Sequence, residues 1–162
     1  MRKSVLLMFL LFAVGMTASA QKFALIDMEY ILKNIPAYER ANEQLNQASK
    51  KWQSEVEKVA EEAKTLYKNY QSEAVFLSEE QKGKKEEAIV AKEREAAELR
   101  RTYFGPEGEL FKKRESLMQP IQDEIYNAVK EISEQKGYSV VVDRASAASI
   151  IFASPQIDIS NE

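Results

Sequence analysis

The feature that most constrains the fold of this chain is the long segment 37–82, which contains neither glycine nor proline. Apolar or small residues recur in it at alternating steps of three and four, which is the period of an α-helix. At about 1.5 Å per residue, a helix over residues 38–77 spans roughly 60 Å, more than the diameter of a compact domain of this size. We therefore expect a helix that projects from any core. The stripe consists of Tyr38, Ala41, Leu45, Ala48, Trp52, Val56, Val59, Ala63, Leu66 and Tyr70.

The chain then reverses into a second helix. Ser78-Glu79-Glu80-Gln81 is a capping box, in which the serine and glutamine side chains satisfy each other's backbone amides at a helix start. We place the tip of a helical hairpin near 75–79 and the second helix over about 79–103. One step of four between Trp52 and Val56 departs from the heptad pattern of the first helix, and such a slip locally unwinds a coiled coil.

A break follows at Gly105-Pro106-Glu107-Gly108, because proline removes a helical hydrogen bond and glycine disfavours helix. A helical stripe resumes at Phe111 and continues to Ile132, with a bend expected at Pro120. Lys136-Gly137 is a typical helix end. Residues 37–136 are thus predicted to form one helical arm.

Apolar runs on both sides of the arm predict three strands, at about 22–27, 138–143 and 150–153. Asp27 and Asp143 lie at strand ends. A pair of carboxylates can perform acid–base chemistry, but helix capping and turn formation are the simpler roles for these two aspartates. The predicted fold class is α+β and mostly helical. A long antiparallel hairpin projects from a small β body made by 21–36 and 137–162. Three strands make a small core, so we expect the body to be completed by other subunits.

The first 20 residues predict a cleavable signal peptide: a basic start, an apolar run from Val5 to Val14, and Ala18-Ser19-Ala20 before the cut. The apolar run is too short to span a membrane. Loss of Arg2 and Lys3 lowers Lys+Arg from 23 to 21 against 26 Asp+Glu, so the net charge changes from −3 to −5. This acidic balance argues against nucleic-acid binding.

Histidine and cysteine are both absent from the 162 residues. There is accordingly no histidine base, thiolate nucleophile, disulfide or ordinary zinc site. No phosphate loop or nucleophile motif occurs either. We expect no enzymatic activity, no metal and no cofactor.

Candidate interaction residues fall into three groups. Heptad positions predict a seam between the two arm helices, although the same side chains could instead touch a bound protein. Apolar positions off that seam are the better candidates for client contacts. A basic cluster around the break is either an anion or lipid contact or a solvated face with internal ion pairs. The seam comprises Trp52, Val56, Val59, Leu66, Tyr70, Ile89, Leu99 and Tyr103; the client group Tyr67, Val75, Phe76, Leu77, Val90 and Phe104; the basic cluster Arg100, Arg101, Lys112, Lys113 and Arg114.

The joint order of these features resembles the Skp (OmpH-like) family of periplasmic chaperones. The resemblance rests on 23–28 after the leader, on Pro36 before the arm, and on 137–143, 150–153 and 157–160 after it. It implies a homotrimer whose strands form a shared body and whose three arms enclose a cavity. It also implies a periplasmic holdase that uses no ATP and keeps unfolded outer-membrane β-barrel proteins from aggregating, with contact to membrane or lipopolysaccharide. The family's well-known members are strongly basic, whereas this chain is acidic.

An alternative interpretation fits the heptads and the acidic balance equally well. In it, the chain is a structural or adaptor coiled coil of the cell envelope with one fixed partner. A holdase would crosslink to many envelope proteins, whereas an adaptor would crosslink to one.

Overall fold

The computed structural model describes residues 21–146 and 150–162, so the predicted signal peptide lies outside the described residues. The chain divides into two compact units. One combines the chain up to Ile31 with Asn127–Glu162, and the other is Leu32–Tyr126.

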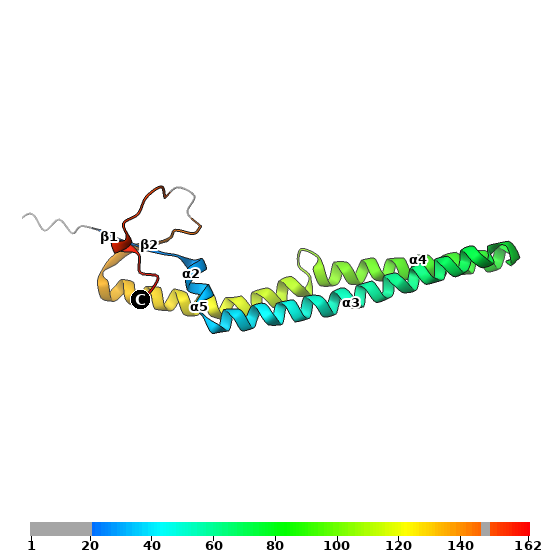
Figure 1. Ribbon diagram of the computed structural model, residues 1–162, viewed down its shortest axis with the longest axis horizontal. Coiled ribbons are helices and arrows are strands. Elements are labelled where there is room, and N and C mark those ends of the chain that lie inside the picture. The colour runs from blue at the N-terminus through cyan, green and yellow to red at the C-terminus, as the bar shows by residue number, and fades with distance from the viewer. Residues whose placement is uncertain (1–20, 147–149) are drawn as a thin grey trace, which may run out of the picture. The chain divides into compact units, whose positions relative to one another are not determined.

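The larger unit contains a long antiparallel helical hairpin (Figure 1). Helix α3 (Pro36–Glu73) starts with proline at its first position, where the missing amide costs nothing, and leads through the 3₁₀ turn η1 (Ala74–Phe76) into α4 (Glu79–Phe104). Both hydrogen bonds of the expected capping box are present. The Gln81 amide donates to Ser78 Oγ (3.4 Å) and the Ser78 amide to Gln81 Oε1 (3.0 Å). The predicted mostly helical fold with a hairpin is confirmed.

The seam between α3 and α4 has few large buried side chains. Val56 and Ile89 are buried, and the ring of Trp52 stacks on that of Tyr103 at 5.2 Å. Polar pairs cross between the helices, among them Lys92 with Glu62 at 3.0 Å. Much of the hairpin's cohesion therefore comes from contacts that water can reach.

One predicted seam position is corrected. Leu66 is 38% exposed, whereas Ala63, one helical turn before it, is buried. The apolar stripe of α3 is wider than its contact with α4, because an alanine allows close approach and leaves its larger neighbour at the edge.

The hairpin does not lead directly into the third long helix. α4 ends at Phe104, residues 105–108 form a loop, and α5 (Glu109–Lys136) follows. α5 continues through Pro120, with Ile121 and Ile125 buried just beyond it. Gly137 then adopts φ 71°, the left-handed conformation that ends helices and that glycine accepts without strain.

The smaller unit is built on two parallel strands, β1 (Lys22–Ile26) and β2 (Tyr138–Asp143). Its core consists of Ala24, Ile26 and Ile159, with side chains of the short helix α2 (Met28–Lys33) and of α5 packed against it. A second 3₁₀ turn, η2 (Pro155–Ile157), precedes Asp158, which forms an isolated bridge with Leu25 beside β1.

The strand expected at 150–153 is not formed, so this prediction is wrong for the single chain. Residues 150–154 have no regular secondary structure. Ile151 and Phe152 are 101% and 85% exposed. A strand exists only when another strand satisfies its backbone groups, and among the described residues β2 pairs only with β1.

Candidate client-binding surface

The most exposed apolar side chains of the hairpin lie at its tip. Val75 and Phe76 in η1 are 84% and 86% exposed, whereas Leu77 is half-buried. This exposure follows from their position, because the three residues of η1 join α3 to α4 at the end of the hairpin. Two of the three tip candidates are therefore available to a partner.

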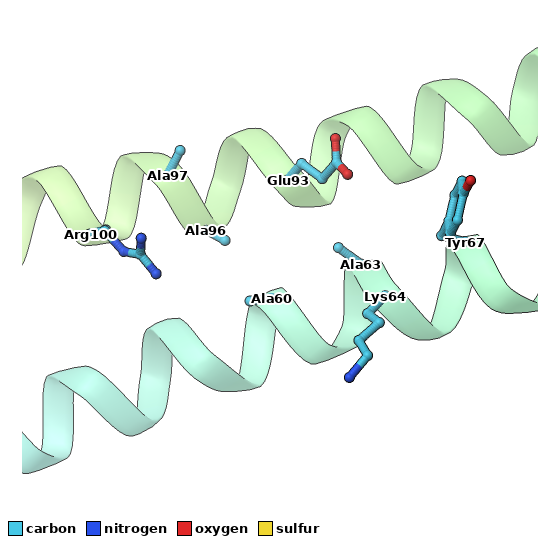
Figure 2. A pocket seen from close by; sticks show the side chains of 8 residues that line it. All are labelled: Ala60, Ala63, Lys64, Tyr67, Glu93, Ala96, Ala97 and Arg100. Atoms are coloured by element: carbon cyan, nitrogen blue, oxygen red, sulfur yellow. The ribbon is translucent and has the colours of Figure 1, made fainter.

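A groove between α3 and α4 forms a second apolar surface, shown in Figure 2, with a volume of about 390 Å³. Ala63 and Ala96 point into the space between the helices, where larger residues would have filled it. Tyr67 forms one end and is 50% exposed, and Arg100 lies at the other. The remaining lining residues are Ala60, Lys64, Glu93 and Ala97.

Of the predicted client residues, Tyr67 lines the groove, whereas Val90 and Phe104 only share a face of α4 with residues that line it. Along α4, Val90, Glu93, Ala97, Arg100 and Phe104 follow one another at steps of three or four, so they share one helical face. Val90 and Phe104 are 41% and 37% exposed. The structure thus gathers Tyr67, Val90 and Phe104 along the grooved face and leaves Val75 and Phe76 as a separate cluster at the tip. The sequence prediction missed the groove itself.

A second apolar hollow, of about 650 Å³, surrounds Leu66, which lies exposed at the edge of the seam. Its rim is charged by Lys58, Glu61, Glu62 and Lys92, and Thr65 completes it. The hydrogen bonds from Lys92 to Glu95 and Glu62 raise the pKa of the lysine, so it remains a cation at neutral pH. The charged rim keeps this side of the hairpin solvated.

The predicted basic cluster is divided. Arg100 belongs to the groove, whereas Arg101 and Lys112 line a hollow of about 480 Å³ at the 105–108 loop. Lys112 pairs with Glu109 at 3.1 Å. Lys113 is half-buried and Arg114 exposed. These five basic residues therefore do not form one continuous basic surface.

Two tyrosines of the seam donate hydrogen bonds to carboxylates of the facing helix. Tyr70 donates to Glu86, and Tyr103 donates to Glu55 over 2.6 Å. These hydrogen bonds raise the pKa of both phenols, so both stay protonated as donors at neutral pH. Their role is to hold the two helices together.

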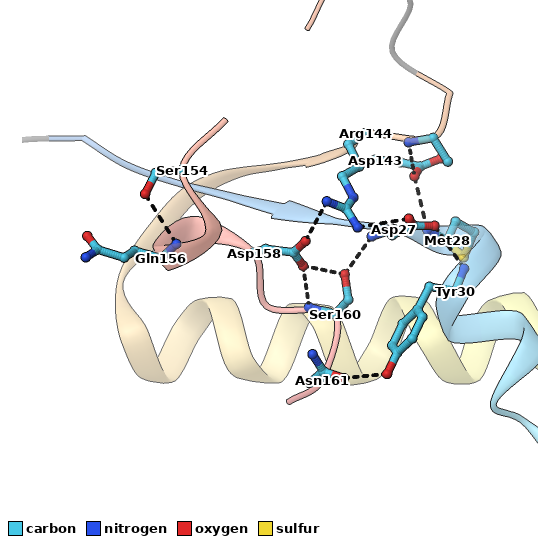
Figure 3. Close-up of polar contacts among 11 residues, drawn as sticks. Asp27, Met28, Tyr30, Asp143, Arg144, Ser154, Gln156, Asp158, Ser160 and Asn161 are labelled. Atoms are coloured by element: carbon cyan, nitrogen blue, oxygen red, sulfur yellow. Dashed lines mark hydrogen bonds and ion pairs between the residues drawn. The ribbon is translucent and has the colours of Figure 1, made fainter. Parts of the chain in front are cut away.

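The two aspartates at strand ends have structural roles, as Figure 3 shows. Asp27 accepts from the Tyr30 amide (2.9 Å), and Asp143 accepts from the Met28 amide (3.1 Å), which caps α2. Arg144 joins the network by pairing with Asp27 and Asp158, each at 3.1 Å. The capping interpretation is therefore confirmed.

This network predicts a loss of stability in acid. The Ser160 hydroxyl and amide donate to Asp158 and lower its pKa, so the ionised carboxylate stabilises the fold above the unfolded-state pKa of about 3.9. That stability is lost as the pH falls through the folded-state pKa. Asp158→Asn should lower the urea midpoint at pH 7, and the difference from wild type should shrink toward about pH 3. An equal difference at both pH values would contradict this assignment.

The described residues 21–146 and 150–162 include no group of three or more metal-ligating side chains suited to an ion. In the same part of the chain, no helix has the length and apolarity needed to cross a bilayer. The described part of the chain is thus defined by an antiparallel helical hairpin with exposed apolar side chains and a groove between its two helices.

Comparison with known proteins gives the family. Residues 22–162 match the family model described as Outer membrane protein (OmpH-like), so the chain belongs to the OmpH-like family. A crystal structure of an OmpH-like protein from Caulobacter crescentus has the same fold at a TM-score of 0.70. It is 11% identical, with 86% of this chain and 79% of that chain covered. No match was found among curated proteins. The predicted relationship to a chaperone family is confirmed.

Proposed function

We propose that this protein is a periplasmic holdase that binds unfolded outer-membrane β-barrel proteins without ATP and prevents their aggregation. The observation that carries the proposal is the set of apolar side chains exposed along one hairpin, at the tip and on the grooved face. Many weak contacts of this kind suit sequence-tolerant binding, and they allow release without an energy source. Membership of the OmpH-like family supports the same conclusion.

We propose further that the working form is a homotrimer. The smaller unit supports this, since Phe23 and Val140 of its sheet are 51% and 45% exposed, in addition to Ile151 and Phe152. A subunit interface would cover these side chains and give residues 150–153 a strand partner. In such an assembly the three hairpins would surround one client.

The function is tested by diluting a β-barrel porin out of urea in the presence of residues 21–162. Light scattering should stay low when the trimer is equimolar with the porin, and rise when the protein is omitted. Full aggregation at equimolar trimer would refute the holdase. Crosslinking in envelope extracts distinguishes the holdase from the adaptor alternative. Many crosslinked proteins would support the holdase, whereas one dominant partner would identify an adaptor.

Contact with an anionic lipid surface is the remaining part of the proposal. Among the described residues, Arg100, Arg101 and Arg114 make no ion pair, so their charges are available. Flotation with vesicles that contain lipopolysaccharide, compared with neutral vesicles, tests this contact. Binding to neither kind of vesicle would remove it.

A further inference from the structure

The irregular step in the apolar stripe of α3 and the end of α4 lie side by side in the hairpin. Along the stripe of α3, steps of three and four alternate except at Trp52, which lies four residues from both Ala48 and Val56. α4 ends at Phe104, one residue after Tyr103. Because Tyr103 stacks on Trp52, with ring centroids 5.2 Å apart and planes inclined by 10°, the slip in α3 lies opposite the break between α4 and α5.

The loop 105–108 is closely folded. The Gly105 amide donates to the Arg101 carbonyl (2.8 Å) and closes α4, and the Gly108 amide donates to the Gly105 carbonyl (2.9 Å). Gly108 is buried, and a Cβ there would lie 2.7 and 2.8 Å from the carbonyl oxygens of Thr102 and Tyr103. The loop therefore folds back against the last turn of α4 in a way that requires glycine.

The break changes what resists bending at this level. A continuous α-helix is stiff because each amide bonds to the carbonyl four residues before it, and that ladder is interrupted between Phe104 and Glu109. Of the two helices of the hairpin, α3 alone passes this level without interruption. Side-chain contacts must supply the rest of the stiffness.

Three side chains supply such contacts, and we call Trp52, Tyr103 and Glu55 the latch. Tyr103 stacks on Trp52 and donates its hydroxyl to Glu55 Oε2 over 2.6 Å, so one residue of α4 is bound twice to α3. The other oxygen of Glu55 lies 4.0 Å from Nζ of Lys51 on the same helix. Release of Tyr103 would thus leave the carboxylate with an ion-pair partner, which lowers the cost of opening.

We propose that this level is a latched joint, at which residues 53–104 can change their angle to the rest of the unit Leu32–Tyr126. The latch holds the described conformation, and its opening permits the pivot. The joint is a property of the hairpin alone and does not depend on the proposed client or on the trimer.

Spin labels can test the joint, because the chain has no cysteine of its own. We would label Ala88→Cys on α4 and Glu115→Cys on α5, both exposed positions on either side of the joint, and dilute labelled chain with excess unlabelled chain. Pulsed electron resonance should give one narrow distance distribution for the otherwise unaltered protein. Tyr103→Ala should broaden it and shift its mean.

The control is Tyr67→Ala, which removes a tyrosine from the same unit outside the joint and should leave the distribution narrow. Tyr103→Phe keeps the ring and loses only the hydrogen bond, so it should broaden the distribution less and shift the emission of the single tryptophan. Should Tyr103→Ala lose helical circular dichroism, Tyr103→Phe decides the question. An unchanged distribution in the folded variants, or equal broadening by Tyr67→Ala, would overturn the proposal.

Discussion

Replacing Val75 and Phe76 by serine should remove most of the protection against porin aggregation while leaving the protein folded. Full burial of such a side chain is worth about 1.5–3 kcal/mol, and each 1.4 kcal/mol is about tenfold in affinity. Even partial burial of both side chains against a client therefore predicts binding at least roughly tenfold weaker. Light scattering at a series of chaperone concentrations measures the loss.

The fold should tolerate this change, because both side chains are more than four-fifths exposed and a serine at such positions alters stability by about 0.5 kcal/mol or less. Tyr126→Ser is the matched control. It removes a 68% exposed aromatic side chain from α5, away from the tip, and should keep full protection. Equal loss in the tip variant and the control would show that protection follows total apolar surface and not the tip.

The hairpin was predictable from sequence because its signals are local. The helical period of the stripe from Tyr38 to Tyr70 and the capping box at Ser78 each involve residues within a few positions of one another. A helix satisfies its own backbone, so these signals suffice without knowledge of any partner. The same reasoning explains why the interruption after Phe104 follows directly from Gly105 and Pro106.

Strand 150–153 was mispredicted for the opposite reason. The run Ile150-Ile151-Phe152-Ala153 has the composition of a buried strand, but no local signal says which chain will pair with it. Within one chain the segment stays irregular and exposed. Composition alone therefore identifies a segment suited to a strand, and whether the strand forms depends on pairing in the tertiary or quaternary structure.

The groove was missed because alanines within an apolar stripe were counted as packing residues. Ala63 does pack, at 5% exposure, but Ala63 and Ala96 facing each other leave space that Tyr67 and Arg100 only border. Whether two small residues close a seam or open a groove depends on the register between the helices, which one helix's pattern does not determine. The same dependence on register placed Leu66 at the edge of the seam.

Ile151→Asp combined with Phe152→Asp should convert the proposed trimer into a monomer. Each side chain is almost fully exposed in the single chain, so the aspartates meet no steric or desolvation cost there. In the interface proposed to cover these residues, each subunit would have to bury two carboxylates among apolar groups, at a cost of several kcal/mol per charge. Sedimentation equilibrium should find three chain masses for the wild-type protein and one for the variant.

Tyr126→Asp provides the control for added charge, because it introduces an aspartate at an exposed aromatic position of α5 and should leave the trimer mass unchanged. Circular dichroism should show equal helix content in all three proteins, since the hairpin α3–α4 has its own seam. The proposed assembly fails if the double variant keeps the trimer mass, or if the wild-type protein sediments as a single chain. In either case, the exposure of Ile151 and Phe152 would need an explanation other than a subunit interface. The tip and the grooved face could still be tested as client-binding surfaces of a single hairpin.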